Sequence, residues 1–346
     1  MSKKWRASDI PSLTGKRVLI TGANSGIGYH TALKLARKGA HVIFACRDRR
    51  RGEAALARME ADSPGTHAEL ALLDLASLAS IRDFAATELA RDRSLHLLIN
   101  NAGVMTPPRR METVDGFELQ FGTNVIGHFA LTALLMPALE RADHESFAVG
   151  AGRPRVVTIA SIAHKRGRIN FEDLQSARNY SPMGAYQQSK LANLLIAFEL
   201  DRRLRATNSG VMSIAAHPGV ADTNLFKSGQ YSAFENSFRY LLGHVIGIVL
   251  NTDSEGALPT LYAATSSDAK DAGYYGPQGF QEMRGEEVGP AKLAPQTNDT
   301  ATATRLWKIC EELTGIEFPQ RYNERPASVL TAKRAAVEAA ALRKQG

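Results

Sequence analysis

The chain has few residues that could cross-link it or bind a metal. Its 346 residues include only two cysteines, Cys46 and Cys310. Two cysteines form no disulfide framework, and these two lack the spacing of metal ligands. The paired carboxylates and clustered histidines that metal catalysis uses are also missing from the sequence. We therefore expect no structural disulfide and no catalytic metal.

Long apolar runs are missing as well. The first nine residues carry positive charge, but no apolar stretch follows them, so we expect no signal peptide. The most apolar segment, residues 240–250, is too short to span a bilayer. Together with the low cysteine content, these absences predict a soluble protein in the reducing environment of the cytoplasm.

Basic residues exceed acidic ones, but their pattern does not indicate a nucleic-acid site. The formal net charge is +7 and the isoelectric point is about 9.4. Aromatic residues do not alternate with the basic residues, as stacking on single strands would require. Apart from Arg47, we predict solvated side chains and no nucleic-acid partner. The basic clusters are residues 47–51, 109–110, 153–155 and 165–168.

The order of apolar segments predicts an α/β fold. Short β-branched runs alternate with longer helical patterns rich in Ala, Leu and Arg, as in βαβ units with a parallel sheet. No repeat or long linker divides residues 1–318, so we expect one Rossmann-like, doubly wound domain with helices on both faces of a mostly parallel, seven-stranded sheet. A C-terminal extension, 319–346, is expected to be helical. The predicted strands are 17–21, 41–45, 68–73, 95–100, 155–160, 211–216 and 273–275; the clearest helices are 28–38, 79–92, 118–141 and 184–206; and 143–154 is predicted to be a surface insertion.

A glycine-rich loop follows the first predicted strand. Its glycines are spaced G-x-x-x-G-x-G between that strand and a helical pattern. Glycine lets the backbone approach a pyrophosphate closely, and the helix N-terminus meets the phosphate charge. The loop therefore predicts a dinucleotide site, with a purely structural turn as the alternative. The residues expected to contact the cofactor here are Gly22, Asn24, Ser25, Gly26, Ile27 and Gly28.

The residues at the end of the second predicted strand indicate whether the site prefers NAD or NADP. A site that prefers NAD usually has an acidic residue here, which bonds the ribose 2′-hydroxyl. This chain has Cys46 and then Arg47, and a guanidinium suits a 2′-phosphate. Asp48, one position later, weakens the argument, but we expect NADP(H) rather than NAD(H). After the third strand, Asp74 and Leu75 are expected to hold the adenine.

Tyr186 and Lys190 lie four residues apart in a predicted helix, and therefore on one helix face. A fixed ammonium beside a phenol favours the phenolate. The pair thus predicts a tyrosine with a pKa lowered from its ordinary value near 10, which suits a proton donor. Alone, such a pair is common on solvated helices, so the prediction depends on the cofactor motifs upstream.

With these residues in place, the chain resembles the short-chain dehydrogenase/reductase family over about residues 15–265. Asn124, Ser161, Tyr186 and Lys190 match the four catalytic positions of the family in order. The resemblance implies that Tyr186 donates the proton and that Lys190 lowers its pKa and bonds the nicotinamide ribose. Ser161 would orient the carbonyl oxygen, and Asn124 would hold a water that links Lys190 to solvent. The alternatives are a strand-end cap for Ser161, a buried structural amide for Asn124 and a surface lysine for Lys190.

The same resemblance extends the cofactor site. The strand-end signature Asn100–Gly103 matches the segment beside the cofactor ribose, and the segment from His217 to Thr223 matches the one that flanks nicotinamide. His217 itself is expected to serve the local turn, and His164 to be a solvated loop residue rather than an additional acid. The residues that this adds to the cofactor site are Asn101, Ala102, Gly103, Pro218, Gly219 and Thr223, with Tyr186 and Lys190 contributing as well.

Within the family, residues 115–118, 124–129 and 186–193 are most similar to the retinol dehydrogenase-like branch. That branch interconverts retinoids, lipid aldehydes and other apolar carbonyl compounds with their alcohols, mainly with NADP. We accordingly expect a small-molecule carbonyl or alcohol substrate under an apolar lid at about residues 221–250. The lid's aromatic residues would alternatively bury one another, or rest on a membrane surface as a peripheral contact.

Other activities and states stay open at this point. A nucleotide-sugar epimerase or dehydratase shares Tyr-x-x-x-Lys but has a different glycine spacing, and a photochemical pyrrole reductase would carry cysteines that this chain lacks between Cys46 and Cys310. A non-catalytic NADP-binding regulator would have lost a catalytic residue. Relatives pair through the helices around Asn124 and Tyr186, so we expect a homodimer or homotetramer, unless the C-terminal tail blocks that surface.

Overall fold

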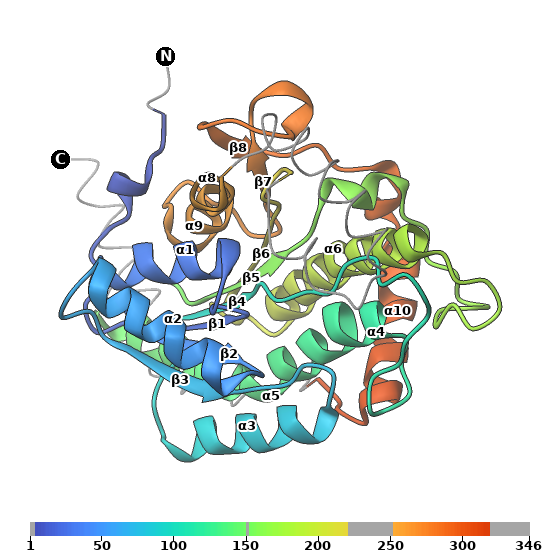
Figure 1. The fold of residues 1–346 in the computed structure, drawn as a ribbon, viewed down its shortest axis with the longest axis horizontal. Helices are drawn as coiled ribbons and strands as arrows, with labels where there is room; N and C mark the ends of the chain where they lie inside the picture. The colour runs from blue at the N-terminus through green and yellow to red at the C-terminus, as the bar shows by residue number, and fades with distance from the viewer. Residues whose placement is uncertain (1–3, 150–151, 221–251, 319–346) are drawn as a thin grey trace.

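The computed structural model describes residues 4–149, 152–220 and 252–318 (Figure 1). The predicted lid at 221–250, Thr223 and the extension at 319–346 lie outside the described residues.

One eight-stranded sheet, in the order β3-β2-β1-β4-β5-β6-β7-β8, forms the centre of the molecule. Neighbouring strands from β3 to β7 are parallel, and β8 is antiparallel to β7. The predicted α/β class and the first seven strands are confirmed, whereas β8 was not predicted. The strands are β1 Arg17–Thr21, β2 His41–Cys46, β3 Ala68–Leu72, β4 Leu97–Asn100, β5 Arg155–Ile159, β6 Met212–Ala216, β7 Tyr274–Pro277 and β8 Val288–Pro290.

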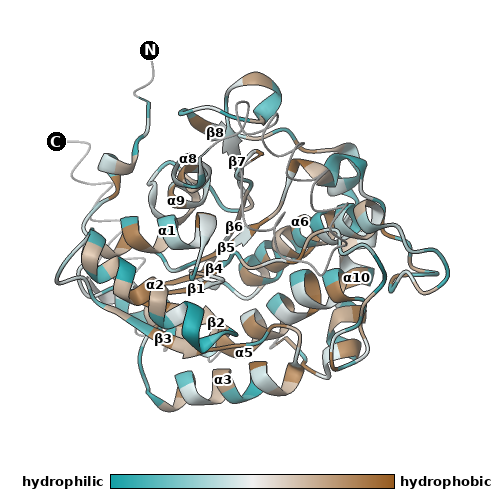
Figure 2. Cartoon of the chain, viewed as in Figure 1, coloured by the Kyte–Doolittle hydropathy of each residue, from teal (hydrophilic) through white to brown (hydrophobic). Residues whose placement is uncertain are grey.

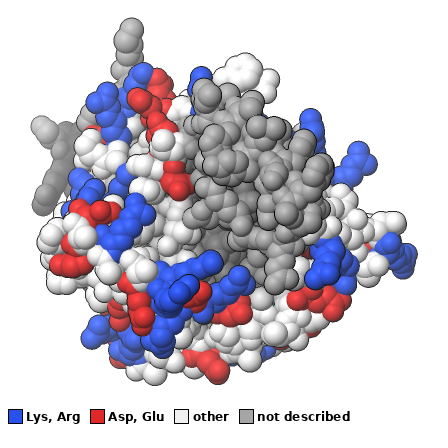
Figure 3. All heavy atoms as spheres, viewed as in Figure 1, with Lys and Arg blue, Asp and Glu red and all other residues white. Residues whose placement is uncertain are grey.

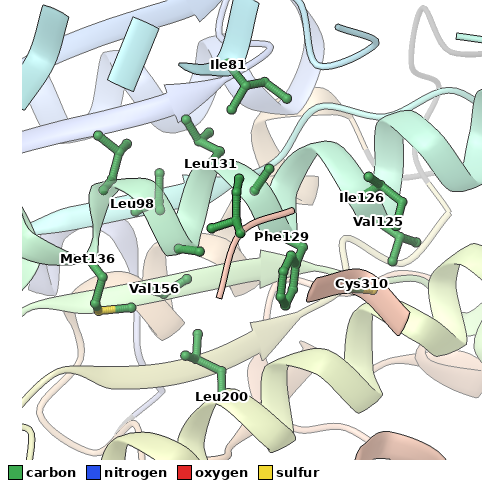
Figure 4. Close-up of a cluster of buried hydrophobic side chains, with 14 of the residues drawn as sticks. Ile81, Leu98, Val125, Ile126, Phe129, Leu131, Met136, Val156, Leu200 and Cys310 are labelled. Atoms are coloured by element: carbon green, nitrogen blue, oxygen red, sulfur yellow. The ribbon is translucent and has the colours of Figure 1, made fainter. Parts of the chain in front are cut away.

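Helices cover both faces of the sheet because its strands are apolar on both sides. In β1, Leu19 packs with α3, α5, α6 and α10, while its neighbours Val18 and Ile20 pack with α1, α2 and α9. Such strands are typical of parallel sheets buried between helices. Figure 4 shows part of the first of these two cores, and Figure 2 shows that the surface helices carry both hydrophobic and hydrophilic residues. The helices are α1 Gly26–Ala36, α2 Arg49–Asp62, α3 Leu78–Ala90, α4 Leu119–Phe121, α5 His128–Val149, α6 Pro182–Ala206, α8 Asp253–Gly256, α9 Leu258–Thr265 and α10 Thr300–Thr314.

The helix predicted at 118–141 is longer and less regular than expected. A π-helical turn, η2 Gly122–Gly127, separates α4 from α5. α5 continues to Val149, so the prediction of a surface insertion from residue 143 is wrong. The reason is a contact with a distant part of the chain: the carboxylate of Asp143 is buried and accepts a hydrogen bond from the backbone of Gly210 at 2.9 Å. The stretch Leu119–Ser146 is apolar enough to cross a membrane, but 89% of its most apolar window is buried inside the molecule.

α10 covers the outer side of α5 and α6 (Figure 1). The ring of Trp307 lies 4.9 Å from that of Phe129 in α5, and the guanidinium of Arg203 in α6 stacks 4.6 Å from the Trp307 ring centre. Cys310, also in α10, is buried and reduced, as is Cys46. The apolar positions of α10 thus belong to the core of the domain.

Basic residues on the surface are largely interspersed with acidic ones (Figure 3). Members of the clusters noted in the sequence form ion pairs with carboxylates, including Arg153 with Asp271 at 2.8 Å and Lys165 with Glu282 at 2.6 Å. Arg49 pairs more loosely with Glu53, at 3.6 Å. These pairs reduce the local excess of positive charge.

Candidate active site

The glycine loop makes a tight turn between β1 and α1 that only glycine fits. Gly22 and Gly26 have φ angles of +67° and +56°, in the left-handed region that favours glycine. A Cβ atom added to Gly28 would lie 2.4 Å from the carbonyl oxygen of Gly22, so the two segments pack backbone to backbone. Ser25 precedes α1 and makes no side-chain cap, which leaves the first N–H groups of that helix available to an anion. This cradle fits a pyrophosphate.

The strand-end signature, Asn100–Gly103, packs against the glycine loop and is hydrogen-bonded to its first residue, Thr21. The side-chain amide of Asn101 donates to the carbonyl oxygen of Thr21 at 2.8 Å. The backbone N–H groups of Asn101 and Ala102 both donate to the Thr21 hydroxyl at 2.9 Å. Ala102 also lies against Gly22, where a Cβ atom would approach to 3.1 Å. The structure thus brings the two predicted cofactor segments together.

The side chains at the ends of β2 and β3 differ in what they are free to bind. Asp48 accepts a hydrogen bond from the backbone of Arg51 at 3.0 Å and caps α2. Arg47 is exposed, and none of the carboxylates that the structure describes forms an ion pair with it. Asp74 accepts from the backbone of Ala76 at 3.0 Å, within its own turn. Arg47 is therefore a charged group at this edge that remains available to a ligand.

Asn124 is fully buried inside the π-helical turn, and its side chain joins two segments. Its oxygen accepts from the backbone of Val104 at 2.7 Å, and its amide donates to the Val104 carbonyl at 2.9 Å and to the hydroxyl of Ser189 at 3.0 Å. Both amide hydrogens are used, as the structural alternative anticipated. π-helical turns are frequent at functional sites, and this one holds Asn124 beside Gly103, the last residue of the strand-end signature. A Cβ atom added to Gly103 would lie 3.3 Å from the amide oxygen of Asn124 and 3.8 Å from Lys190 Nζ.

His128 belongs to the site but was not predicted from the sequence. Its Nδ1 lies 3.1 Å from the carbonyl oxygen of Asn124, which can only accept, so Nδ1 donates. Its Nε2, 2.9 Å away, therefore accepts from the hydroxyl of Thr21. Burial lowers the pKa of His128 to about 4, which keeps this neutral form. The signal available in the sequence was its position four residues after Asn124, on the same helix face.

Ser161, Tyr186 and Lys190 meet at the carboxyl ends of the parallel strands, as predicted. Ser161 lies two residues after the end of β5, directly before the 3-10 turn 162–166, and accepts the backbone N–H of Ala163 at 3.2 Å, which leaves its hydroxyl hydrogen free to donate. The phenol of Tyr186, in α6, makes a hydrogen bond with the Ser161 side chain. Lys190 is 4% exposed, so it is no surface lysine. Its ammonium donates to the carbonyl oxygen of Ile159 at 3.0 Å and lies 5.7 Å from the Tyr186 ring centre.

The pKa of Tyr186 is not lowered, contrary to expectation. Burial raises it to about 12, and the hydrogen bond from Ser161 offsets only part of that effect. Burial also lowers the pKa of Lys190 to about 8. The reason for the difference is that the ammonium bonds a backbone carbonyl instead of the phenol, so the loss of hydration controls both groups.

Two histidines near the site have different outcomes. His217 serves the local turn as predicted, because its Nδ1 accepts from the backbone of Gly219 at 3.1 Å. Pro218 lies between them in this turn, at the end of β6. His164 was expected to be solvated, and this is wrong, since its side chain is fully buried behind Ser161.

Comparisons with known proteins agree with this geometry. The family model described as short chain dehydrogenase matches residues 16–231. Retinol dehydrogenase 13 of Homo sapiens is 39% identical over 312 residues, which cover 89% of this chain and 87% of that protein. Polyprenol dehydrogenase of Mus musculus is 40% identical over 311 residues, which cover 90% and 87%. The crystal structure of an uncharacterized protein from Mycobacterium Paratuberculosis has 40% identity and a TM-score of 0.71, and the match covers 92% of this chain and 100% of that one. The chain therefore belongs to the short-chain dehydrogenase/reductase family, in its retinol dehydrogenase-like branch, and is an NAD(P)-dependent oxidoreductase that acts on CH–OH groups.

Proposed function

We propose that this enzyme uses NADP(H) to interconvert an apolar, isoprenoid-like or lipid-like aldehyde or ketone with its alcohol. One observation carries the proposal: the phenol of Tyr186 is hydrogen-bonded to Ser161 and lies one helical turn from the buried Lys190. These residues stand at the edge of the sheet that also holds the glycine loop, where ligands bind in such folds. The bound nicotinamide supplies hydride chemistry, and the residues of this chain supply position and protons.

In carbonyl reduction, Ser161 and Tyr186 bind the substrate oxygen together. Ser161 can donate its one hydroxyl hydrogen to that oxygen, while one of its two lone pairs accepts the backbone N–H of Ala163. As negative charge develops there, Tyr186 transfers its phenol proton to it. Lys190, with a pKa of about 8, is mainly charged at neutral pH and stabilises the phenolate that remains. Asn124 forms hydrogen bonds that hold the segments around these residues in place. We also keep the proposal that a water held at its main chain links Lys190 to solvent.

The raised pKa of Tyr186 favours the protonated phenol at neutral pH. A phenol with a pKa of about 12 stays protonated and is ready to act as the acid in reduction. Oxidation of an alcohol needs the phenolate, which becomes available only at higher pH. We therefore expect reduction to be favoured near pH 7 and oxidation to gain as the pH rises.

The preference for NADP rests on Arg47 and Asp48. The exposed guanidinium of Arg47 lies at the end of β2, and the Asp48 carboxylate that would repel a 2′-phosphate is occupied by the helix cap. The glycine loop, Asn101, Ala102 and Gly103 would hold the rest of the cofactor, with Asp74 and Leu75 beside the adenine. Pro218, Gly219 and Thr223 complete the predicted cofactor set.

The substrate class rests on the names of the relatives. Retinol and polyprenol are both long isoprenoid alcohols, and proteins named for these substrates match most of this chain. A panel of retinal, long-chain aldehydes and polar sugars, each assayed with NADPH and NADH, tests substrate and cofactor together. Activity with the apolar aldehydes and NADPH supports the proposal, and activity confined to sugars contradicts it.

The alternative functions, the cellular location and the oligomeric state are argued from fewer observations. Since Ser161, Tyr186 and Lys190 are all in place, a non-catalytic regulator is disfavoured, and the glycine spacing disfavours an epimerase. We place the enzyme in the cytoplasm, with peripheral membrane contact as the route to a lipid substrate. We keep a homodimer or homotetramer as a proposal. α10 packs against α6, and its Trp307 contacts Phe129 of α5, so light scattering that gives the 37.5 kDa mass of one chain would show that α10 blocks this pairing surface.

A further inference from the structure

His164 lies directly behind Ser161, in the turn η3 Ile162–Arg166, and none of its side chain is exposed. Its ring makes an edge-to-face contact with that of Tyr274 in β7, with ring centres 5.4 Å apart. Buried polar groups are nearly always hydrogen-bonded, so the two ring nitrogens need partners inside the protein.

Those partners determine which nitrogen carries the proton. Nδ1 lies 2.7 Å from the carbonyl oxygen of Ser161, which can only accept, so Nδ1 donates. Nε2 lies 3.3 Å from the backbone nitrogen of Ala294, which can only donate, so Nε2 accepts. A neutral imidazole protonated on Nδ1 satisfies both bonds. Burial lowers the pKa of His164 and favours this neutral form.

The segment that contains Ala294 is held against the turn of His164 by further hydrogen bonds. Ala294 precedes the turn η6 Pro295–Asn298. From that turn, the side-chain amide of Gln296 donates to the carbonyl oxygens of His164, Lys165 and Gly167 at 3.1 to 3.3 Å. The turn after Ser161 is therefore anchored to a segment about 130 residues further along the chain.

The bonds that His164 donates to the Ser161 carbonyl oxygen fix the position of Ser161. The Ser161 carbonyl accepts from the backbone N–H of His164 at 3.1 Å as well as from its Nδ1. With the carbonyl fixed in this way, rotation of the Ser161 peptide is restricted, and its hydroxyl stays between Ala163 and Tyr186.

We propose that His164 is a positioning residue for Ser161, which it holds through the bond from Nδ1 to the Ser161 carbonyl while Nε2 is anchored on Ala294. The inference rests on the proposed role of Ser161 in binding the carbonyl oxygen. Misplacement of a reacting group by about 1 Å can cost about a hundredfold in rate, so the bond matters for kcat more than for substrate affinity.

Three variants separate positioning from simple packing. His164→Asn places an amide near the position of Nδ1 and can still donate to Ser161, whereas His164→Gln places one near Nε2 and can only reach Ala294. His164→Ala removes both bonds. We expect kcat for carbonyl reduction to fall roughly 10- to 100-fold in His164→Ala and His164→Gln, with NADPH affinity unchanged, and to be restored to within about threefold of wild type in His164→Asn. Equal losses in the Asn and Gln variants, in proportion to lost thermal stability, would overturn the proposal.

A second measurement does not depend on activity. Nitrogen NMR of protein labelled in histidine is expected to show two buried, neutral imidazoles with a bonded proton on Nδ1, those of His128 and His164, and the signal that is lost in His164→Asn is assigned to His164. A proton on Nε2, or a charged ring at pH 7, overturns the inference. The failure of the proposed function is seen separately, as a wild-type enzyme inactive on every carbonyl of the panel or a Ser161→Ala variant with full activity.

Discussion

At the amino ends of the strands, the buried pair Arg17 and Glu88 is charged, whereas at the carboxyl ends burial shifts the groups of the proposed site towards their neutral forms. Arg17 opens β1 and donates to Glu88 of α3 at 2.9 Å, with both side chains at most one-tenth exposed. Burial alone would raise the pKa of nearby Glu69, but its hydrogen bond from Arg91 holds that pKa below the ordinary value. Opposite charges here compensate for lost hydration.

At the carboxyl ends, Lys165 pairs with Glu282 at 2.6 Å, but no carboxylate among the described residues forms an ion pair with the groups of the proposed site itself. Burial shifts the pKa of His128 to about 4, of Lys190 to about 8 and of Tyr186 to about 12, each in the direction of the neutral form. Neutral imidazoles act as directed hydrogen-bond bridges, and a protonated phenol can be an acid. The difference indicates that one end of the sheet stabilises the fold, while the other is arranged for proton transfer.

Breaking the charged end is expected to have the largest effect on stability. Arg17→Met removes the closer of the two cations that pair with Glu88 and leaves Arg91 at 3.3 Å, so the free energy of unfolding should fall by up to about 3 kcal/mol, with turnover per folded molecule unchanged. Urea unfolding measures the loss. Arg49→Met, which removes an exposed pair with Glu53, is the matched control and should cost less than about 1 kcal/mol. Equal losses of unfolding free energy in the two variants would show that the buried Arg17 pair stabilises the fold no more than the exposed Arg49 pair.

At the proposed active site, we expect a substitution to reduce activity and to leave stability nearly unchanged. Ser161→Ala removes a hydrogen-bond donor to the developing negative charge, and kcat for carbonyl reduction should fall about 10²- to 10³-fold. Thermal unfolding should shift little, because the hydroxyl accepts only one backbone bond at a 3-10 turn. A large loss of stability with kcat retained would reverse the comparison.

Acid should weaken the contributions of the buried histidines and of the carboxylate pairs in different pH ranges. His128 has an ordinary pKa of 6.5 when unfolded and about 4 when folded, so the unfolded chain binds the extra proton first. Its contribution is complete above pH 6.5 and is lost as the pH falls from 6.5 towards 4, by about 2 kcal/mol at pH 5. The Glu69 pairs fail only below the ordinary carboxyl range. Urea unfolding between pH 8 and 4 measures the slope, and constant stability from pH 6.5 to 5 would contradict the account.

Arg47 is expected to have the smallest effect and to act on the cofactor alone. Arg47→Ala removes the guanidinium expected to bind the 2′-phosphate, and a charge-assisted hydrogen bond contributes about 1.5 kcal/mol or more, or roughly tenfold. KM for NADPH should rise about tenfold, while KM for NADH stays unchanged. Arg49→Ala serves as the control in the same cluster. An equal change for both cofactors would remove the argument for NADP.

Much of this arrangement could be predicted from local sequence. The glycine spacing specified the turn before α1, and the four-residue separation of Tyr186 and Lys190 put both on the buried face of α6. β8 could not be predicted, because Val288–Pro290 is a three-residue edge strand with one β-forming side chain.

What could not be predicted depends on distant contacts. The continuation of α5 past Asp143 depends on Gly210, and the burial of His164 depends on Ala294. The pKa of Tyr186 was predicted in the wrong direction because spacing locates Lys190 but says nothing about the carbonyl of Ile159, to which its ammonium donates.

The most direct test of the central claim is carbonyl reduction by Tyr186→Phe at saturating cofactor. Removing the phenol hydroxyl deletes the acid and little else, so the rate should fall about 10²- to 10⁴-fold, with NADPH affinity and thermal stability close to wild type. Tyr29→Phe, whose hydroxyl bonds Asp62 away from the site, should keep its rate. Undiminished reduction by Tyr186→Phe would contradict the assignment of the proton to this phenol.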